Sequence, residues 1–211
     1  MHSVEVEGPP EAGDTSRVEG QTTKLAFGSN LDIEESGSRQ ILVLVMPEDN
    51  YTEHLLLVVK EISKLPGKIC YISLNRPYNS LVGIMQHSGL DLKKIHFIDA
   101  ITKTAQLTTK CDECEFISSP GALTELSVTI SKLMDTGDYK YIIFDSLSTL
   151  LVYESDTTIT KFVHYLMAKV RVAGCNAIFT CLKQDANSIL IKDINMFADK
   201  VIDLEKWHLG V

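Results

Sequence analysis

The stretch YKYIIFDSLSTLL, residues 139–151, decides the fold class of this chain. It holds a near-continuous apolar run, YIIF, that ends in the charged residue Asp145, with Ser146 next. A second run of the same kind, AIFTCL, spans residues 177–182. Strands that are apolar throughout are typical of parallel sheets with both faces buried under helices. The sequence therefore predicts an α/β fold with a mostly parallel sheet flanked by helices on both faces, a three-layer sandwich.

Outward from that stretch, short β-branched runs alternate with segments of helical periodicity. The runs predict strands at residues 41–45, 68–74, 94–98, 115–118, 140–144, 176–182 and 200–204. Between them, three sets of apolar residues each share one helical face. These sets are Tyr51, Leu55, Val58, Val59 and Ile62; Leu123, Leu126, Ile130, Leu133 and Met134; and Ile159, Phe162, Val163, Leu166, Met167 and Val170. Ser119 before Pro120 predicts a helix start, because serine caps free amides and proline suits the first helical position.

Composition bounds the partners and the compartment. The chain has 211 residues, 45% of them hydrophobic, and a formal net charge of −8. That charge opposes binding to nucleic acid, and no apolar stretch is long enough to cross a bilayer. Five cysteines are an odd number, and Cys70, Cys175 and Cys181 lie in or beside apolar runs, where reduced thiols act as small hydrophobes. We expect a cytoplasmic protein without a nucleic-acid or membrane partner.

Residues 1–38 differ in composition from the rest of the chain. They are rich in Gly, Pro, Glu, Ser and Thr, with eight acidic residues against Arg17 and Lys24. Such a segment buries too little apolar surface to offset its ordering entropy. We predict a largely disordered acidic tail, in which only Thr23–Phe27 could pair as an edge strand, and one α/β domain over residues 39–211.

The segment ILVLVMPEDNYTEHLLLVV, residues 41–59, has the form of a phosphate-binding turn. A P-loop reads G-x-x-x-x-G-K-[ST]: its glycines expose backbone amides, its lysine neutralises phosphate and its hydroxyl binds magnesium. At the four fixed positions of that frame the chain has Pro47, Thr52, Glu53 and His54. Glu48 and Asp49 bring the loop to three carboxylates, which repel a triphosphate. The alternative interpretation is an acidic helix N-terminus, which the helix dipole favours.

Asp145 and Ser146 stand where parallel sheets bind their ligands, directly after the carboxyl end of a strand. A Walker-B aspartate is presented to magnesium in this way. An aspartate at the end of a buried strand also commonly caps the turn that follows, so the motif has low specificity by itself.

Three segments together resemble the RecA-type ATPases of the KaiC and RadA group, especially their archaeal members. They are GKICYISLNRPYNSLVGIMQHSGLDLKKIHFIDA (67–100), YIIFDSLSTLL (141–151) and MFADKVIDLE (196–205). The resemblance covers about residues 40–206 and implies a RecA-like sheet. It also implies a full Walker A motif at residues 47–54, where this chain has none of the four fixed residues of that motif.

The same resemblance implies catalytic glutamates after the second strand, where this chain has Asn75 and Arg76. Of the site, only Asp145 matches. Losing the phosphate cradle and the general base together removes both substrate positioning and proton transfer. We therefore predict a non-catalytic pseudo-ATPase without ATP or magnesium, which acts through a protein partner or as a homo-oligomer in a regulatory or signalling role. The alternative is a nucleotide-binding ATPase or sensor that uses Asp145 and magnesium without a conventional P-loop.

KCDEC, residues 110–114, holds a lone C-x-x-C pair, Cys111 and Cys114. Zinc normally takes four ligands, and the histidines of the chain show no matching spacing. A redox-active pair lies at a helix N-terminus, whereas this pair precedes a predicted strand. The pair is thus a candidate zinc or thiol module, or simply part of a surface loop.

Overall fold

The computed structural model describes residues 39–106 and 110–206, so the predicted acidic tail over residues 1–38 lies outside the described residues. All seven predicted strands form, and they make one sheet in the order β4-β3-β2-β5-β6-β1-β7, with every neighbouring pair parallel. The strands are β1 (Ile41–Met46), β2 (Lys68–Ser73), β3 (Ile95–Asp99), β4 (Cys114–Phe116), β5 (Tyr139–Asp145), β6 (Asn176–Leu182) and β7 (Lys200–Asp203).

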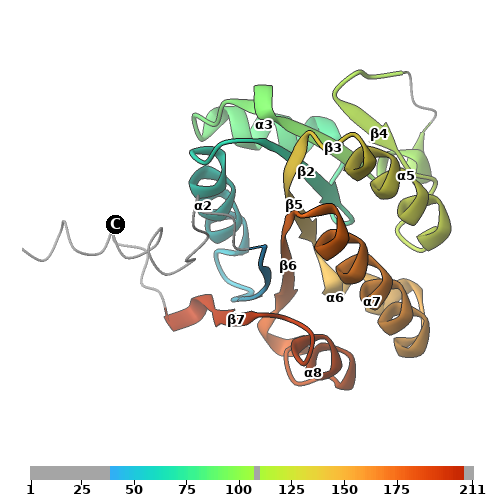
Figure 1. The fold of residues 1–211 in the computed structure, drawn as a ribbon. Coiled ribbons are helices and arrows are strands. Elements are labelled where there is room, and N and C mark those ends of the chain that lie inside the picture. The colour runs from blue at the N-terminus through green and yellow to red at the C-terminus, as the bar shows by residue number, and fades with distance from the viewer. Residues whose placement is uncertain (1–38, 107–109, 207–211) are drawn as a thin grey trace, which may run out of the picture. The chain divides into compact units, whose positions relative to one another are not determined.

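Helices cover both faces of the sheet, which confirms the predicted three-layer α/β fold (Figure 1). The α-helices are α2 (Tyr51–Ser63), α3 (Tyr78–His87), α4 (Thr102–Ala105), α5 (Leu123–Asp135), α6 (Leu147–Tyr153), α7 (Asp156–Ala173) and α8 (Ile189–Asn195). Short 3₁₀ turns lie at η1 (Leu92–Lys94), η2 (Lys183–Asp185) and η3 (Leu204–Lys206). Helices α2 and α3 lie on one face, and α5 and α7 lie on the other. Within the described ranges, no helix combines the length and the apolar character that crossing a membrane requires.

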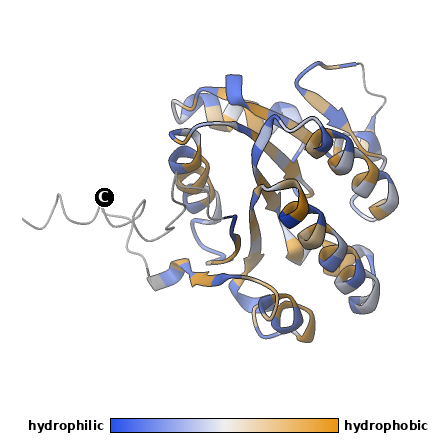
Figure 2. Cartoon of the chain, in the orientation of Figure 1, coloured by the Kyte–Doolittle hydropathy of each residue, from blue (hydrophilic) through white to orange (hydrophobic). Residues whose placement is uncertain are grey.

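The core forms because the strands are apolar on both faces and the helices on one. Every residue of β1 is buried, as expected for a strand deep inside a parallel sheet. Figure 2 shows the hydrophobic colour concentrated in the strands and the hydrophilic colour in the turns. In α7 the six residues of the predicted apolar face are all buried. The Ser155 side chain caps the start of α7 by accepting from the Thr158 amide, and Gly174 ends it in the left-handed conformation.

The helix start predicted at Ser119 and Pro120 is wrong. Helix α5 begins at Leu123, and its N-cap residue is Ala122, which has no capping side chain. The amide of Ala122 donates to the carbonyl of Ser119, so the intervening residues form a turn. The Ser118 amide and hydroxyl instead bind the Glu125 carboxylate from the first turn of α5. Serine and proline favour turns as well as helix starts, and here they form a turn that precedes α5.

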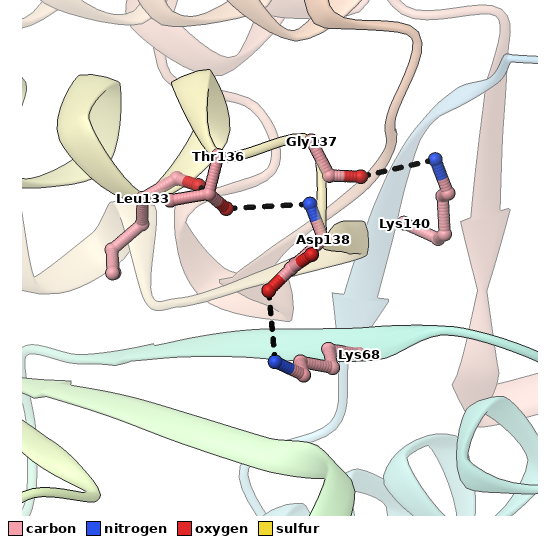
Figure 3. Close-up of polar contacts among 6 residues, drawn as sticks. All are labelled: Lys68, Leu133, Thr136, Gly137, Asp138 and Lys140. Atoms are coloured by element: carbon pink, nitrogen blue, oxygen red, sulfur yellow. Dashed lines mark hydrogen bonds and ion pairs between the residues drawn. The ribbon is translucent and has the colours of Figure 1, made fainter.

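At the amino-terminal edge of the sheet, polar contacts tie the α5–β5 connection to β2 (Figure 3). Lys68 Nζ lies 2.9 Å from Asp138 Oδ2, and Lys140 Nζ donates to the Gly137 carbonyl at 3.2 Å. The side chains of Lys68 and Asp138 are 54% and 56% exposed, so their ion pair is screened by water. These contacts hold the α5–β5 connection beside the start of β2. The buried strands stabilise the fold.

Candidate functional site at the carboxyl edge of the sheet

Asp145 is the last residue of β5 and is fully buried. It lies opposite Ser73 of β2, and β6 on its other side contributes Thr180. Because strand side chains alternate between faces, Tyr71, two residues before Ser73, shares the Asp145 face of the sheet. Helix α2 covers that face and brings Tyr51, its first residue, to the same carboxylate.

Three neutral donors bind the two oxygens of Asp145. The Tyr71 hydroxyl donates to Oδ2 at 2.7 Å, and Asn75 Nδ2 donates to Oδ1 at 2.8 Å. The Tyr51 hydroxyl donates to Oδ1 as well, and it lies 2.9 Å from Thr180 Oγ1. Side chains from α2, β2 and the loop after β2 therefore bind the carboxylate, and Thr180 of β6 binds the Tyr51 hydroxyl.

Burial and hydrogen bonding act on the Asp145 pKa in opposite directions. Burial raises the pKa, while the bonds from Tyr51, Tyr71 and Asn75 lower it in part. The outcome is a pKa above the ordinary value of 3.8. Burial, and then the nearby Asp145 charge, raise the pKa values of both tyrosines well above their usual range. Both phenols therefore stay protonated and act as donors.

Asn75 and Arg76, which follow the carboxyl end of β2, hold the site together. Arg76 donates to Thr52 Oγ1 at 2.6 Å, which joins the loop after β2 to the first turn of α2. Ser73 Oγ donates to the Arg76 carbonyl at 2.7 Å, and Thr149 of α6 donates to Asn75 Oδ1. The side chain of Asn75 is an amide, which has no basic atom with which to accept a proton from water.

The P-loop frame over residues 47–54 contains a four-residue connection and the first turn of α2. Asn50 adopts a left-handed conformation, with φ of 63°. Glu48 Oε1 accepts from the Gln184 amide at 2.8 Å, so this carboxylate serves the neighbouring loop. Asp49 and Glu53 are exposed, and within residues 39–106 and 110–206 neither side chain has a hydrogen-bond or ion-pair partner. His54 is buried, and its Nδ1 lies 3.0 Å from the Asn50 carbonyl.

The structure thus brings some of the predicted residues together and separates others. Thr52, Asn75, Arg76 and Asp145 form one connected network. Ser146 is buried beside it, with Oγ 3.3 Å from Thr149 Oγ1. Pro47, Glu48, Asp49, Glu53 and His54 make no bond to the Asp145 carboxylate. Cys111 and Cys114 lie elsewhere, on either side of a two-residue turn, with Cys114 as the first residue of β4.

Sequence reasoning missed Tyr51, Tyr71 and Thr180. The sequence pattern predicts Tyr51 on the apolar face of its helix and Tyr71 inside a strand. The available signal was chemical: a tyrosine or threonine within an otherwise apolar buried run needs a partner for its hydroxyl. Among the described residues, no group of three or more histidine, cysteine, aspartate and glutamate side chains could hold a metal ion.

The comparisons with known proteins concern the family and the fold. A model described as a family of unknown function, DUF7504, matches residues 84–204, which is more than half of the chain. No curated protein matches. Among solved structures, a KaiC-like protein from the hyperthermophilic archaeon Pyrococcus horikoshii is similar, with a TM-score of 0.57 and 16% identity over 81% of this chain and 74% of that one. This likeness supports a RecA/KaiC-like fold.

Proposed function

We propose that this chain, which belongs to the DUF7504 family of unknown function, is a non-catalytic RecA/KaiC-like domain that acts through protein contacts. The observation that carries the proposal is the set of donors around Asp145. A metal-bound aspartate presents free oxygen lone pairs to the ion or to its water shell. Here Tyr51 and Asn75 share Oδ1, and Tyr71 binds Oδ2.

The start of α2 also supports the proposal. A helix N-terminus favours anions through its free amides, but a nucleotide triphosphate needs added positive charge. Instead, Asp49 in the connection and Glu53 in the first turn of α2 are exposed beside those amides. Arg76, a cation close to the start of α2, donates to Thr52. Repulsion between like charges therefore opposes the binding of phosphate groups here.

Nucleotide binding is the first test. Thermal unfolding should be measured without ligand and with millimolar Mg-ATP, Mg-ADP or Mg-GTP. A ligand at 100 times its Kd adds about 2.7 kcal/mol, which raises the Tm of a domain of this size by roughly 5–10 °C. We expect no shift. A clear shift that Asp145→Asn removes would contradict the proposal and favour an ATPase or sensor that uses Asp145 and magnesium.

A second variant distinguishes two reasons why the wild type would fail to bind nucleotide. Tyr51→Ala removes the phenol from Asp145 and leaves the rest of the carboxyl edge in place. Magnesium-dependent ADP binding in this variant, but not in the wild type, would identify Tyr51 as the group that occludes the site. Without binding in either protein, the acidic helix start is sufficient to exclude nucleotide.

Contact through the acidic surface is the second test. Asp49→Lys with Glu53→Lys reverses two exposed charges and leaves Glu48 bound to the Gln184 amide. Asp156→Lys is the matched control, because Asp156 is exposed in the first turn of α7 and has the same relation to its helix dipole as Glu53. Sedimentation velocity of the full chain measures self-association. We expect the double variant to weaken association and the control to retain it, with only a small fall in Tm in each as the helix loses its favourable N-terminal charge. Association that persists in the double variant would place the contact elsewhere.

A further inference from the structure

Cys111 and Cys114 face each other across a two-residue turn. They form an isolated antiparallel bridge, with Asp112 and Glu113 as the turn residues. Cys114 begins the edge strand β4, and the Glu113 carbonyl accepts from the Phe97 amide of β3 at 2.8 Å. One side of the turn is therefore fixed to the sheet.

This placement brings the two cysteines within the reach of a disulfide. Residues opposite each other in an antiparallel pair have Cα atoms about 4.5–5.5 Å apart. Cα atoms joined by a disulfide are usually about 4.4–6.8 Å apart. The buried pair Cys70 and Cys175 differs: Cys70 lies on β2, Cys175 precedes β6, and β5 runs between those strands. Two interstrand spacings amount to about 9–10 Å, which is too far for a bond without backbone movement.

The two thiols of the turn differ in access. Cys111 is half-buried, and its Sγ donates to Glu113 Oε2 at 3.5 Å. Cys114 is 2% exposed, and its Sγ lies 3.8 Å from the Glu115 carbonyl. Burial, and then the nearby Asp99 charge, raise the pKa of Cys114 well above its ordinary range. Cys111 is therefore the thiol that an outside reagent reaches first, and Cys114 is placed to react second.

We propose that Cys111 and Cys114 are a redox-sensitive pair that closes into a reversible disulfide on reaction with a low-molecular-weight disulfide. The Cys111 thiolate attacks one sulfur of the reagent, forming a mixed disulfide and releasing one thiolate. Cys114 then gives its proton to solvent, and its sulfur attacks Cys111 Sγ, expelling the second thiolate. In sum, two cysteine thiols lose two electrons and two protons, and one external disulfide becomes two thiols. This chemistry is independent of the function proposed above.

The surroundings of the turn fit two thiols that close into a disulfide and reopen. A disulfide oxidoreductase keeps its attacking cysteine as a stable thiolate at a helix N-terminus. Here the pair lies in a turn beside an edge strand, and Cys111 Sγ donates to the Glu113 carboxylate. The expected behaviour is slow closure at neutral pH and ready reopening by a thiol reductant.

Two single variants test the order of attack. The native full chain is incubated with oxidised glutathione, and intact mass and peptide maps are recorded. The wild type should lose the mass of two hydrogens through a 111–114 link, and dithiothreitol should reverse the change. Cys114→Ser should stop at a stable glutathione adduct on Cys111. Cys111→Ser should acquire neither adduct nor link, because Cys114 is buried.

Three results would overturn the proposal. They are a stable mixed disulfide on Cys111 of the wild type, an equal adduct on Cys114 of the Cys111→Ser variant, and modification of Cys70, Cys175 or Cys181 while the pair stays reduced. Because Cys114→Ser alters a buried position, its fold is checked by circular dichroism. The wild type can also be titrated in glutathione buffers that contain a rising fraction of oxidised glutathione, and this measurement needs no variant. It should show a single two-electron transition that is confined to the pair.

Discussion

The Tyr71 hydroxyl of β2 donates a 2.7 Å hydrogen bond to Oδ2 of Asp145 at the end of β5. Both residues are fully buried, and they lie on neighbouring parallel strands 74 positions apart in the chain. The bond supplies a donor to a fully buried carboxylate, and it makes Asp145 a structural member of the core. The free energy of that network can be measured directly.

Removing one phenol should destabilise the protein while preserving its fold. Tyr71→Phe leaves the ring in place but deprives a buried carboxylate of a donor, a change that typically costs about 1–3 kcal/mol. Tyr51→Phe should cost a similar amount, because it also leaves Thr180 without the phenol. Urea unfolding followed by circular dichroism gives the free energies. Tyr153→Phe is the control, since Tyr153 is 48% exposed and should change stability by less than about 0.5 kcal/mol. Equal effects at all three sites would contradict a specific role for the network.

Asp145 should make stability fall as the pH rises. Its folded-state pKa lies above the ordinary value of 3.8, so the native state holds the proton more tightly than the unfolded chain. The stability that this residue contributes is complete below pH 3.8 and is lost as the pH rises through the raised pKa. Asp145→Asn does not titrate. The free energy of unfolding of the wild type, measured relative to that variant from about pH 4 to pH 8, should decrease and then level off. A relative increase would mean that the three donors outweigh burial.

The ion pair at the opposite edge of the sheet should matter little. Lys68 and Asp138 are both more than half exposed (Figure 3), and exposed pairs contribute about 0–1 kcal/mol. Lys68→Ala should therefore lower the free energy of unfolding by less than Tyr71→Phe does. Added salt should shrink the small effect of Lys68→Ala. A loss above about 2 kcal/mol would show that this contact stabilises the sheet more than its exposure allows.

Two glycines should respond to alanine in opposite directions. Gly174 ends α7 at φ of 71°, and an added Cβ would lie 3.0 Å from the Arg39 guanidinium, so Gly174→Ala should cost about 1–2 kcal/mol. Gly83 lies inside α3 with nothing within 4 Å of an added Cβ. Gly83→Ala should therefore stabilise by about 0.5–1 kcal/mol. Thermal unfolding of the two variants side by side checks both signs.

The sequence by itself determined the layers of this protein. Apolar runs such as YIIF before Asp145, and the six-residue stripe of α7, report burial through periodicity, which is a local property. The strands and the parallel sheet were therefore predicted correctly. The helix start at Ser119 failed because serine and proline favour turns as well as helix caps.

Only the tertiary structure decided which residues meet at the carboxyl edge. The strand order places β5 beside β2 and β6, so Asp145 meets Tyr71, and α2 then brings Tyr51 between the same carboxylate and Thr180 of β6. The sequence indicates that each tyrosine hydroxyl needs a partner, but it does not identify that partner, which lies 74 or 94 positions away. Periodicity reports which side of an element is buried. The partners of a buried polar group depend on how the strands are ordered.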